Sequence, residues 1–217
     1  MKINDIYLLS FILTNCFLSH FRSCLKTIRQ HGLSVLTDLF LDKQAGQLPT
    51  EILCEVLGKV CIPLSGELIQ EIRRESIRPD ELDVAMVEAD LCVSLIFKPL
   101  RHHMKVVVSN DPSIFLNLWI PMLNVIGTIL DKDSEESSKS PSNEKMTSDI
   151  RELIVEHLRN VIMVLSSFGI LKGSQEEYGD GSISDQTWSL IEDMVYCKKF
   201  VNEWKSAAAN TVVETLP

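Results

Sequence analysis

The sequence is poor in aromatic residues and in the patterns that mark β-strands or enzymes. Aromatic residues make up 6% of the chain, and segments that alternate apolar and polar residues are almost absent, so we expect no β-sheet. No G-x-S-x-G elbow, Walker A loop, G-x-G-x-x-G loop or H-E-x-x-H pair occurs. Each of these motifs places reactive groups at a fixed spacing. The sequence therefore gives no support for catalysis.

Positive charge is also scarce. The formal net charge is -9, whereas binding to phosphate backbones or to an anionic bilayer needs a positive patch. The basic clusters are a stripe at helical spacing and a group at an expected helix end: Arg22, Lys26 and Arg29, then Arg73, Arg74 and Arg78. Such clusters are typical of solvated faces and helix ends. We predict no nucleic-acid partner.

The six cysteines show no C-x-x-C spacing, so neither a zinc knuckle nor a thioredoxin-like site is expected. Cys54 and Cys61 stand seven positions apart, with Leu57, Leu64 and Leu68 on the same helix face. A buried free cysteine behaves as a small hydrophobe. We expect both thiols to pack in the core of a reduced, cytoplasmic protein.

Two alternatives concern the first 24 residues. Cys16, His20 and Cys24 have the spacing of one helical stripe, and a metal- or thiol-dependent protein could use them, although a fourth ligand is missing. The apolar run from Ile6 to Leu18 suggests a signal or a membrane anchor, but polar residues interrupt it and it is too short to span a bilayer. We expect a buried helix there.

Two further patterns indicate no metal or cofactor. His102 and His103 are neighbours that point in different directions on a helix, so a role at a helix end is favoured over chelation. The segment from Asp180 to Asp185 resembles a calcium loop, but Asp185 stands where an EF-hand has glycine and Ile191 where it has glutamate. We expect no bound cofactor, no metal and no catalytic residue.

Apolar residues recur at the helical period along most of the chain, so the fold class is predicted to be all-α. Pro49, Pro79 and Pro112 each precede a long periodic run, at the first turn where a missing N–H is tolerated. The expected helices are 5–20, 21–43, 50–75, 80–108, 112–132, 148–168 and 185–206.

Long helices joined by short turns favour antiparallel helical hairpins stacked as a short α-solenoid of the tetratricopeptide or HEAT kind. The segments Val60–Leu64 and Leu118–Met122 share an apolar pattern around Pro63 and Pro121, and residues 97–100 are a poorer copy. We expect both prolines to bend long helices against their neighbours.

The organisation predicted from these patterns is a helical repeat domain followed by a short tail. The repeat domain covers 1–171, with a flexible loop at 131–145 where the sequence is rich in serine and charge. A linker (172–185), a C-terminal helix (185–206) and a disordered tail (207–217) follow.

Three segments resemble one family. Ser148–Leu165 closed by Phe168–Leu171 has an acidic helix start, an aliphatic run and a Gly-Ile pair, and Phe115–Leu123 bears a tryptophan before it. With Glu51–Leu57 and Ile62–Leu64, these segments are similar to the C-terminal helical region of the large Golgi-type Sec7 Arf guanine-nucleotide exchange factors, the brefeldin A-resistance factor and GNOM group. The resemblance covers 22–171, and Leu53 replaces an aromatic usual in the family.

The resemblance implies a non-catalytic scaffold. The exchange chemistry of that family belongs to a Sec7 domain, whose F-R-L-P-G-E motif does not occur in this sequence, so no catalytic residue is carried over. The implied partners are a Sec7-type Arf exchange factor, an Arf GTPase or Golgi membrane proteins. The implied location is the cytoplasm, with peripheral association with Golgi membranes in vesicle-mediated transport.

Overall fold

The computed structural model describes residues 26–41, 49–74, 78–110, 112–131, 141–171 and 183–211. Within these ranges every regular element is a helix, which confirms the all-α prediction. In chain order the elements are α3 (Lys26–Leu41), α4 (Thr50–Val56), the π-helix η3 (Leu57–Cys61), α5 (Ile62–Arg74), the 3₁₀ turn η4 (Pro79–Glu81), α6 (Leu82–Asn110), α7 (Pro112–Asp131), α8 (Pro141–Ser167), α9 (Ile183–Asp193) and α10 (Val201–Asn210).

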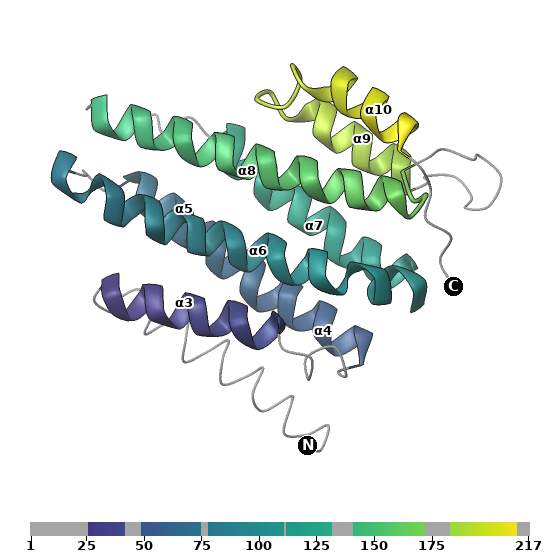
Figure 1. Cartoon of the computed structure of the whole chain (residues 1–217), viewed down its shortest axis with the longest axis horizontal. Helices are drawn as coiled ribbons and strands as arrows, with labels where there is room; N and C mark the ends of the chain where they lie inside the picture. Colours follow the sequence, from purple (N-terminus) through teal and green to yellow (C-terminus); the bar gives the residue numbers. More distant parts are fainter. Residues whose placement is uncertain are drawn as a thin grey trace.

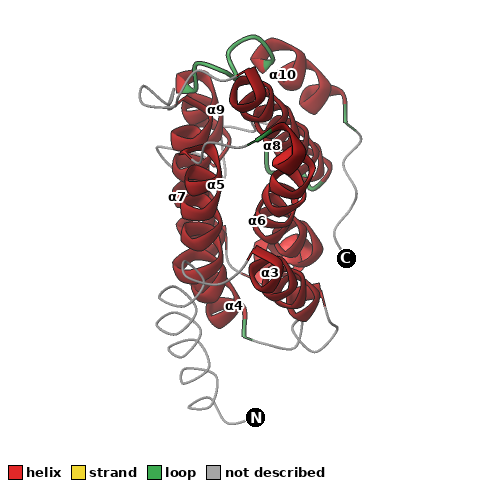
Figure 2. Ribbon diagram, turned by 90° about the vertical axis from the view of Figure 1, so that its left-hand side faces the viewer, coloured by secondary structure: helices red, strands yellow, loops and turns green. Residues whose placement is uncertain are grey.

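The helices form two layers, seen edge-on in Figure 2. One layer contains α3, α6, α8 and α10, and the other contains α4, α5, α7 and α9 (Figures 1 and 2). In the first layer α3, α6 and α8 are each followed in the chain by a helix of the second layer, and α10 is the last helix described. The predicted stack of antiparallel hairpins is therefore confirmed, and its order is α3 with α4–α5, α6 with α7, and α8 with α9.

Several predicted boundaries need correction. The helix expected at 5–20 lies outside the described residues. The helix expected at 148–168 begins at Pro141, so the last five residues of the predicted loop 131–145 are helical; Pro141 holds the first helical position, where proline is favoured. The helix expected at 185–206 is two helices, α9 and α10, separated by a turn at 194–200.

Pro63 has a visible effect on its helix. Because proline has no N–H, the carbonyl of Lys59 cannot receive the usual bond from four residues ahead. The chain forms a five-residue π-helix immediately before Pro63, where the Ile62 N–H donates to the carbonyl of Leu57. The same device does not recur at Pro121, since α7 remains α-helical throughout. The predicted bends at Pro63 and Pro121 stay predictions, and the π-helix before Pro63 is a change of hydrogen bonding found in one of the two helices.

Helix α7 lies at the centre of the second layer. It is long and apolar enough to cross a membrane by length and composition, but Phe115, Trp119 and Met122 are fully buried, and Ile114, Leu116 and Ile120 are partly buried against the same core. The indole N–H of Trp119 donates to the hydroxyl of Thr187 on α9, 2.8 Å away. In this fold α7 is a core helix.

The turn between α9 and α10 is held by the end of α7. Both carboxylate oxygens of Asp131 accept backbone N–H groups of that turn, from Val195 at 3.1 Å and Tyr196 at 3.2 Å. Trp204 of α10 is 1% exposed. Residues beyond 171 thus continue the helical stack instead of standing apart from it.

The end of α8 explains the Gly-Ile pair noted in the sequence. Gly169 has φ 78°, its N–H donates to the carbonyl of Ser166, and the N–H of Ile170 donates to the carbonyl of Leu165. These two bonds are the Schellman motif, which satisfies carbonyls at a helix end and favours glycine. The Gly169-Ile170 pair, which contributes to the family resemblance, therefore ends helix α8.

Candidate protein-binding groove

A shallow groove runs between α6 and α8 on the outer face of the first layer. Its volume is about 560 Å³, within the range typical of ligand sites. Four apolar and four acidic side chains line it: Met86, Val87, Leu91 and Leu153, and Asp90, Asp149, Glu152 and Glu156. No basic residue is among them.

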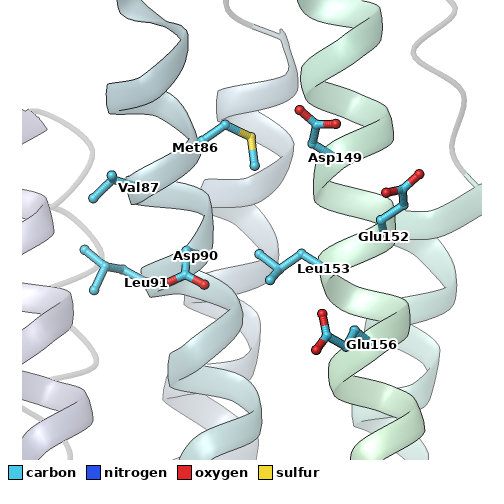
Figure 3. Close-up of a pocket in the computed structure, with 8 residues that line it drawn as sticks. All are labelled: Met86, Val87, Asp90, Leu91, Asp149, Glu152, Leu153 and Glu156. Carbon is cyan, nitrogen blue, oxygen red and sulfur yellow. The ribbon is translucent and has the colours of Figure 1, made fainter.

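Helical spacing arranges these side chains. Asp149, Glu152 and Glu156 stand three and four positions apart, so they share one face of α8. Figure 3 shows Met86 and Leu153 entering the gap between the two helices from opposite sides at different heights, with Asp90, Asp149 and Glu156 beside it. Val87 and Leu91 point to the other side of α6, and Glu152 points away from α6. The groove therefore has an apolar floor made by Met86 and Leu153, an apolar edge at Val87 and Leu91, and an acidic border.

The carboxylates of the groove outnumber the cations near them, of which Lys145 stands four positions before Asp149 on the same face of α8. Across the described ranges, no ion pair involves any of the four. Arg151 lies on α8 but serves another side of that helix, where its Nε donates to the carbonyl of Leu130 at 2.9 Å. In α6 the first Lys or Arg is Lys98, beyond the groove. The negative charge of the groove is uncompensated by the groove's own residues.

His157 marks the end of the groove. Its ring stacks on Phe97 of α6, with centroids 5.4 Å apart and planes 22° apart. Burial lowers the pKa of His157, the carboxylates of Asp90 and Glu156 oppose that shift, and the positive charges of Arg101 and Lys98 add to it. The neutral ring therefore seals the two helices together below the acidic stretch.

The opposite flank of α6, which faces α3, is closed by buried polar contacts. Arg29 Nε lies 2.7 Å from Glu88 Oε1, with side-chain exposures of 6% and 1%. His103 donates Nε2–H to the carbonyl of Phe40, at 2.5 Å, in the last turn of α3. These contacts fix α6 against α3 and leave the α8 flank as the open side.

A family model described as "GBF1-like, tetratrico peptide repeat region" matches residues 13–196 of this chain. The match covers more than half of the sequence. The chain belongs to this family. The range includes every described helix from α3 to α9, so both helices of the groove are part of the GBF1-like region. No curated protein and no solved structure matches the chain.

The resemblance noted in the sequence is confirmed by this match and extends further along the chain than the predicted 22–171. The matched range takes in α9, which packs on α7 through the Trp119–Thr187 hydrogen bond. The GBF1-like region in this chain thus includes the helix that completes the last hairpin.

The cysteines near Pro63 are buried, as predicted. Cys61 is 1% exposed and Cys54 is 7% exposed. Burial raises the pKa of the Cys54 thiol to about 11, with a further contribution from Glu51, and raises the pKa of the Cys61 thiol to about 12. Both stay protonated near neutral pH, so neither is an activated nucleophile.

The other residues considered from the sequence have different outcomes. Cys16, His20 and Cys24 lie outside the described residues, as does the loop from Asp180 to 182. His102 and His103 contact each other edge-to-face within α6, and His103 serves the end of α3, not the end of its own helix. In the described part of the chain, no three His, Cys, Asp or Glu residues are placed to hold a metal.

The groove was not among the sequence predictions. Asp149, Glu152 and Glu156 carry the i, i+3, i+7 signal in the sequence, but that signal equally describes a solvated helix face. Their neighbour Asp90 is about sixty positions earlier, on a helix with no acidic stripe of its own. Only the packing of α6 beside α8 joins the two sets.

Proposed function

We propose that this chain is a non-catalytic interaction module that binds partner proteins of Golgi-type Sec7 Arf exchange factors and supports their recruitment or regulation in vesicle trafficking. The observation that carries the proposal is membership of the GBF1-like tetratrico peptide repeat family over residues 13–196. Stacked helical hairpins offer long surfaces to partners. The α6–α8 groove is such a surface.

The chemistry of the described surface supports binding over catalysis. The cysteines described are buried with raised pKa values, as for Cys197, whose thiol pKa burial raises to about 12. The groove has four carboxylates but no metal-holding cluster in the described residues. We therefore assign the groove to recognition, and we place the chain in the cytoplasm and at Golgi membranes through its protein partners.

The test is association of the purified 217-residue chain with a full-length Golgi-type Sec7 exchange factor, an Arf GTPase and Golgi-enriched membranes, measured by pull-down and by analytical ultracentrifugation. We expect saturable binding to at least one of the three. Absence of binding to all three would contradict the proposal.

A nucleotide-release assay tests the non-catalytic part. The chain alone should leave the rate of nucleotide release from Arf unchanged, because nothing in its groove resembles a phosphate-displacing site. Faster release in the presence of the chain alone would overturn this part of the proposal.

A further inference from the structure

We infer that the groove between α6 and α8 binds a basic amphipathic helix of a partner protein, with lysine or arginine residues pairing with Asp90, Asp149, Glu152 and Glu156. The inference rests on the proposed function, because it names the chemical class of the partner of an interaction module. It is carried by charge complementarity in an apolar groove.

The apolar floor and edge select for a hydrophobic stripe on the occupant. Val87 is 54% exposed, and Met86, Leu91 and Leu153 are half-buried where they line the groove. Exposed apolar side chains that adjoin one another are typical of interaction sites. An occupant that covers them must itself present apolar side chains along one side.

The acidic border selects for positive charge on the occupant. The carboxylates of Asp149 and Glu156 are seven positions apart on one face of α8, about two helical turns or roughly 10 Å. A helix laid along this stretch can place basic residues at positions i, i+3 or i+4, and i+7 opposite them. Apolar anchors at helical spacing are the usual mode by which a groove between helices binds a peptide helix.

The same observations disfavour other ligands. An anionic bilayer or a nucleic acid would be repelled by four carboxylates that form no ion pair among the described residues. A divalent metal needs several ligands that converge, and the described residues hold no such group. An added β-strand needs a sheet edge, and the described part of the chain has no strand.

The test uses the whole chain and a synthetic helical peptide with a leucine stripe bordered by lysines. There are two control peptides. The first has the same composition in scrambled order, and the second has the same leucine stripe bordered by glutamates in place of lysines. Binding is measured by fluorescence anisotropy at low and high salt. The groove variant is Glu152→Lys with Glu156→Lys, both exposed positions, and Val87→Ser tests the apolar edge. The matched control is Asp38→Lys with Asp193→Lys, two exposed acids outside the groove.

We expect the lysine-bordered peptide to bind the unaltered chain saturably. Its affinity should be at least tenfold lower for the Glu152→Lys, Glu156→Lys variant and several-fold lower for Val87→Ser. Its affinity for the control variant should be unchanged. Both control peptides should bind at least tenfold more weakly than the lysine-bordered peptide. Circular dichroism verifies that each variant is folded.

Four outcomes would overturn the inference. The lysine-bordered peptide could bind the groove and control variants equally well, or bind no better than the scrambled peptide. It could also fail to bind at all, or the chain could bind anionic phosphatidylserine vesicles instead. If the groove variant still binds the exchange factor, Arf or Golgi membranes as the unaltered chain does, the inference fails while the proposed function stands. If the unaltered chain binds none of the three, the proposed function itself fails.

Discussion

The two flanks of α6 use acidic residues in opposite ways. On the α3 side, Glu88 is paired with Arg29 and both side chains are buried. On the α8 side, Asp90, Glu152 and Glu156 are exposed and lie in a groove that no basic residue lines. A carboxylate that is buried with its partner fixes how two helices pack, whereas an exposed carboxylate without a partner remains available to a second molecule.

The largest effect is expected from Glu88→Ala. Removing one partner of a buried ion pair leaves the other charge uncompensated, which costs about 3–5 kcal/mol of the free energy of unfolding. Urea denaturation followed by circular dichroism measures it.

The control for this change removes both charges. Arg29→Met combined with Glu88→Leu should be far less destabilising than Glu88→Ala, because apolar side chains of similar size often replace a buried pair at little cost. A loss below about 1 kcal/mol for Glu88→Ala would show that the pair does not lock the α3 flank.

Each flank also contains a histidine that makes stability depend on pH. Burial lowers the pKa of both His103 and His157 below the ordinary value of 6.5, and His102 lowers that of His103 further, against the effect of the Phe40 carbonyl. The folded chain then binds fewer protons than the unfolded chain near and below that value. The stability that each neutral histidine contributes is fully present above pH 6.5, and it is lost as the pH falls from 6.5 through the lower pKa of the folded chain.

The measurement is the unfolding midpoint in urea between about pH 7.5 and about pH 5.5. Acidification should lower it, and His157→Gln or His103→Gln should each flatten the dependence. Glutamine does not take up a proton in this pH range, so each variant's unfolding midpoint at the higher pH is the reference for its own midpoint at the lower pH. Stability that rises on acidification would contradict the assignment.

Ser94 of α6 offers a smaller test. Its hydroxyl is buried, and in the described part of the structure it has no hydrogen-bond partner. Ser94→Ala removes an unsatisfied polar group and favours the helix, so we expect a gain of about 1 kcal/mol. Thr187→Val is the contrasting variant: its hydroxyl accepts the Trp119 N–H, so its loss should destabilise the chain in thermal unfolding. If Ser94→Ala and Thr187→Val changed the stability equally, the distinction between the unsatisfied hydroxyl of Ser94 and the bonded hydroxyl of Thr187 would be contradicted.

The smallest effect on stability is expected in the groove. Glu152→Gln with Glu156→Gln removes two exposed charges that have no described ion pair, so the free energy of unfolding should change by no more than about 0.5 kcal/mol. Differential scanning calorimetry beside Glu88→Ala gives the comparison directly. A loss approaching that of Glu88→Ala would mean that the groove carboxylates are structural.

The sequence was sufficient for the fold class and for most helix starts. Pro79 and Pro112 hold first helical positions, and Pro49 caps α4, because proline tolerates those sites for local reasons. Pro141 has the same role but stands in a polar, serine-rich stretch that lacks apolar periodicity, so its helix start was missed.

Features that depend on packing between distant segments were not predictable in the same way. Apolar periodicity continues across 185–206, but Asp131 of α7 binds the backbone of Val195 and Tyr196 and holds a turn there. The groove likewise requires α6 beside α8. In both cases a residue more than fifty positions away decides what the local pattern leaves open.

The most direct measurement is hydrogen–deuterium exchange of the full chain, alone and bound to a Golgi-type Sec7 exchange factor. Binding at the open flank of α6 predicts new protection in the peptides that cover 86–91 and 149–156, with no change in the α3 peptide that contains the buried Arg29. Protection confined to other helices, with exchange at 86–91 and 149–156 unaltered, would contradict the assignment of the groove as the binding face.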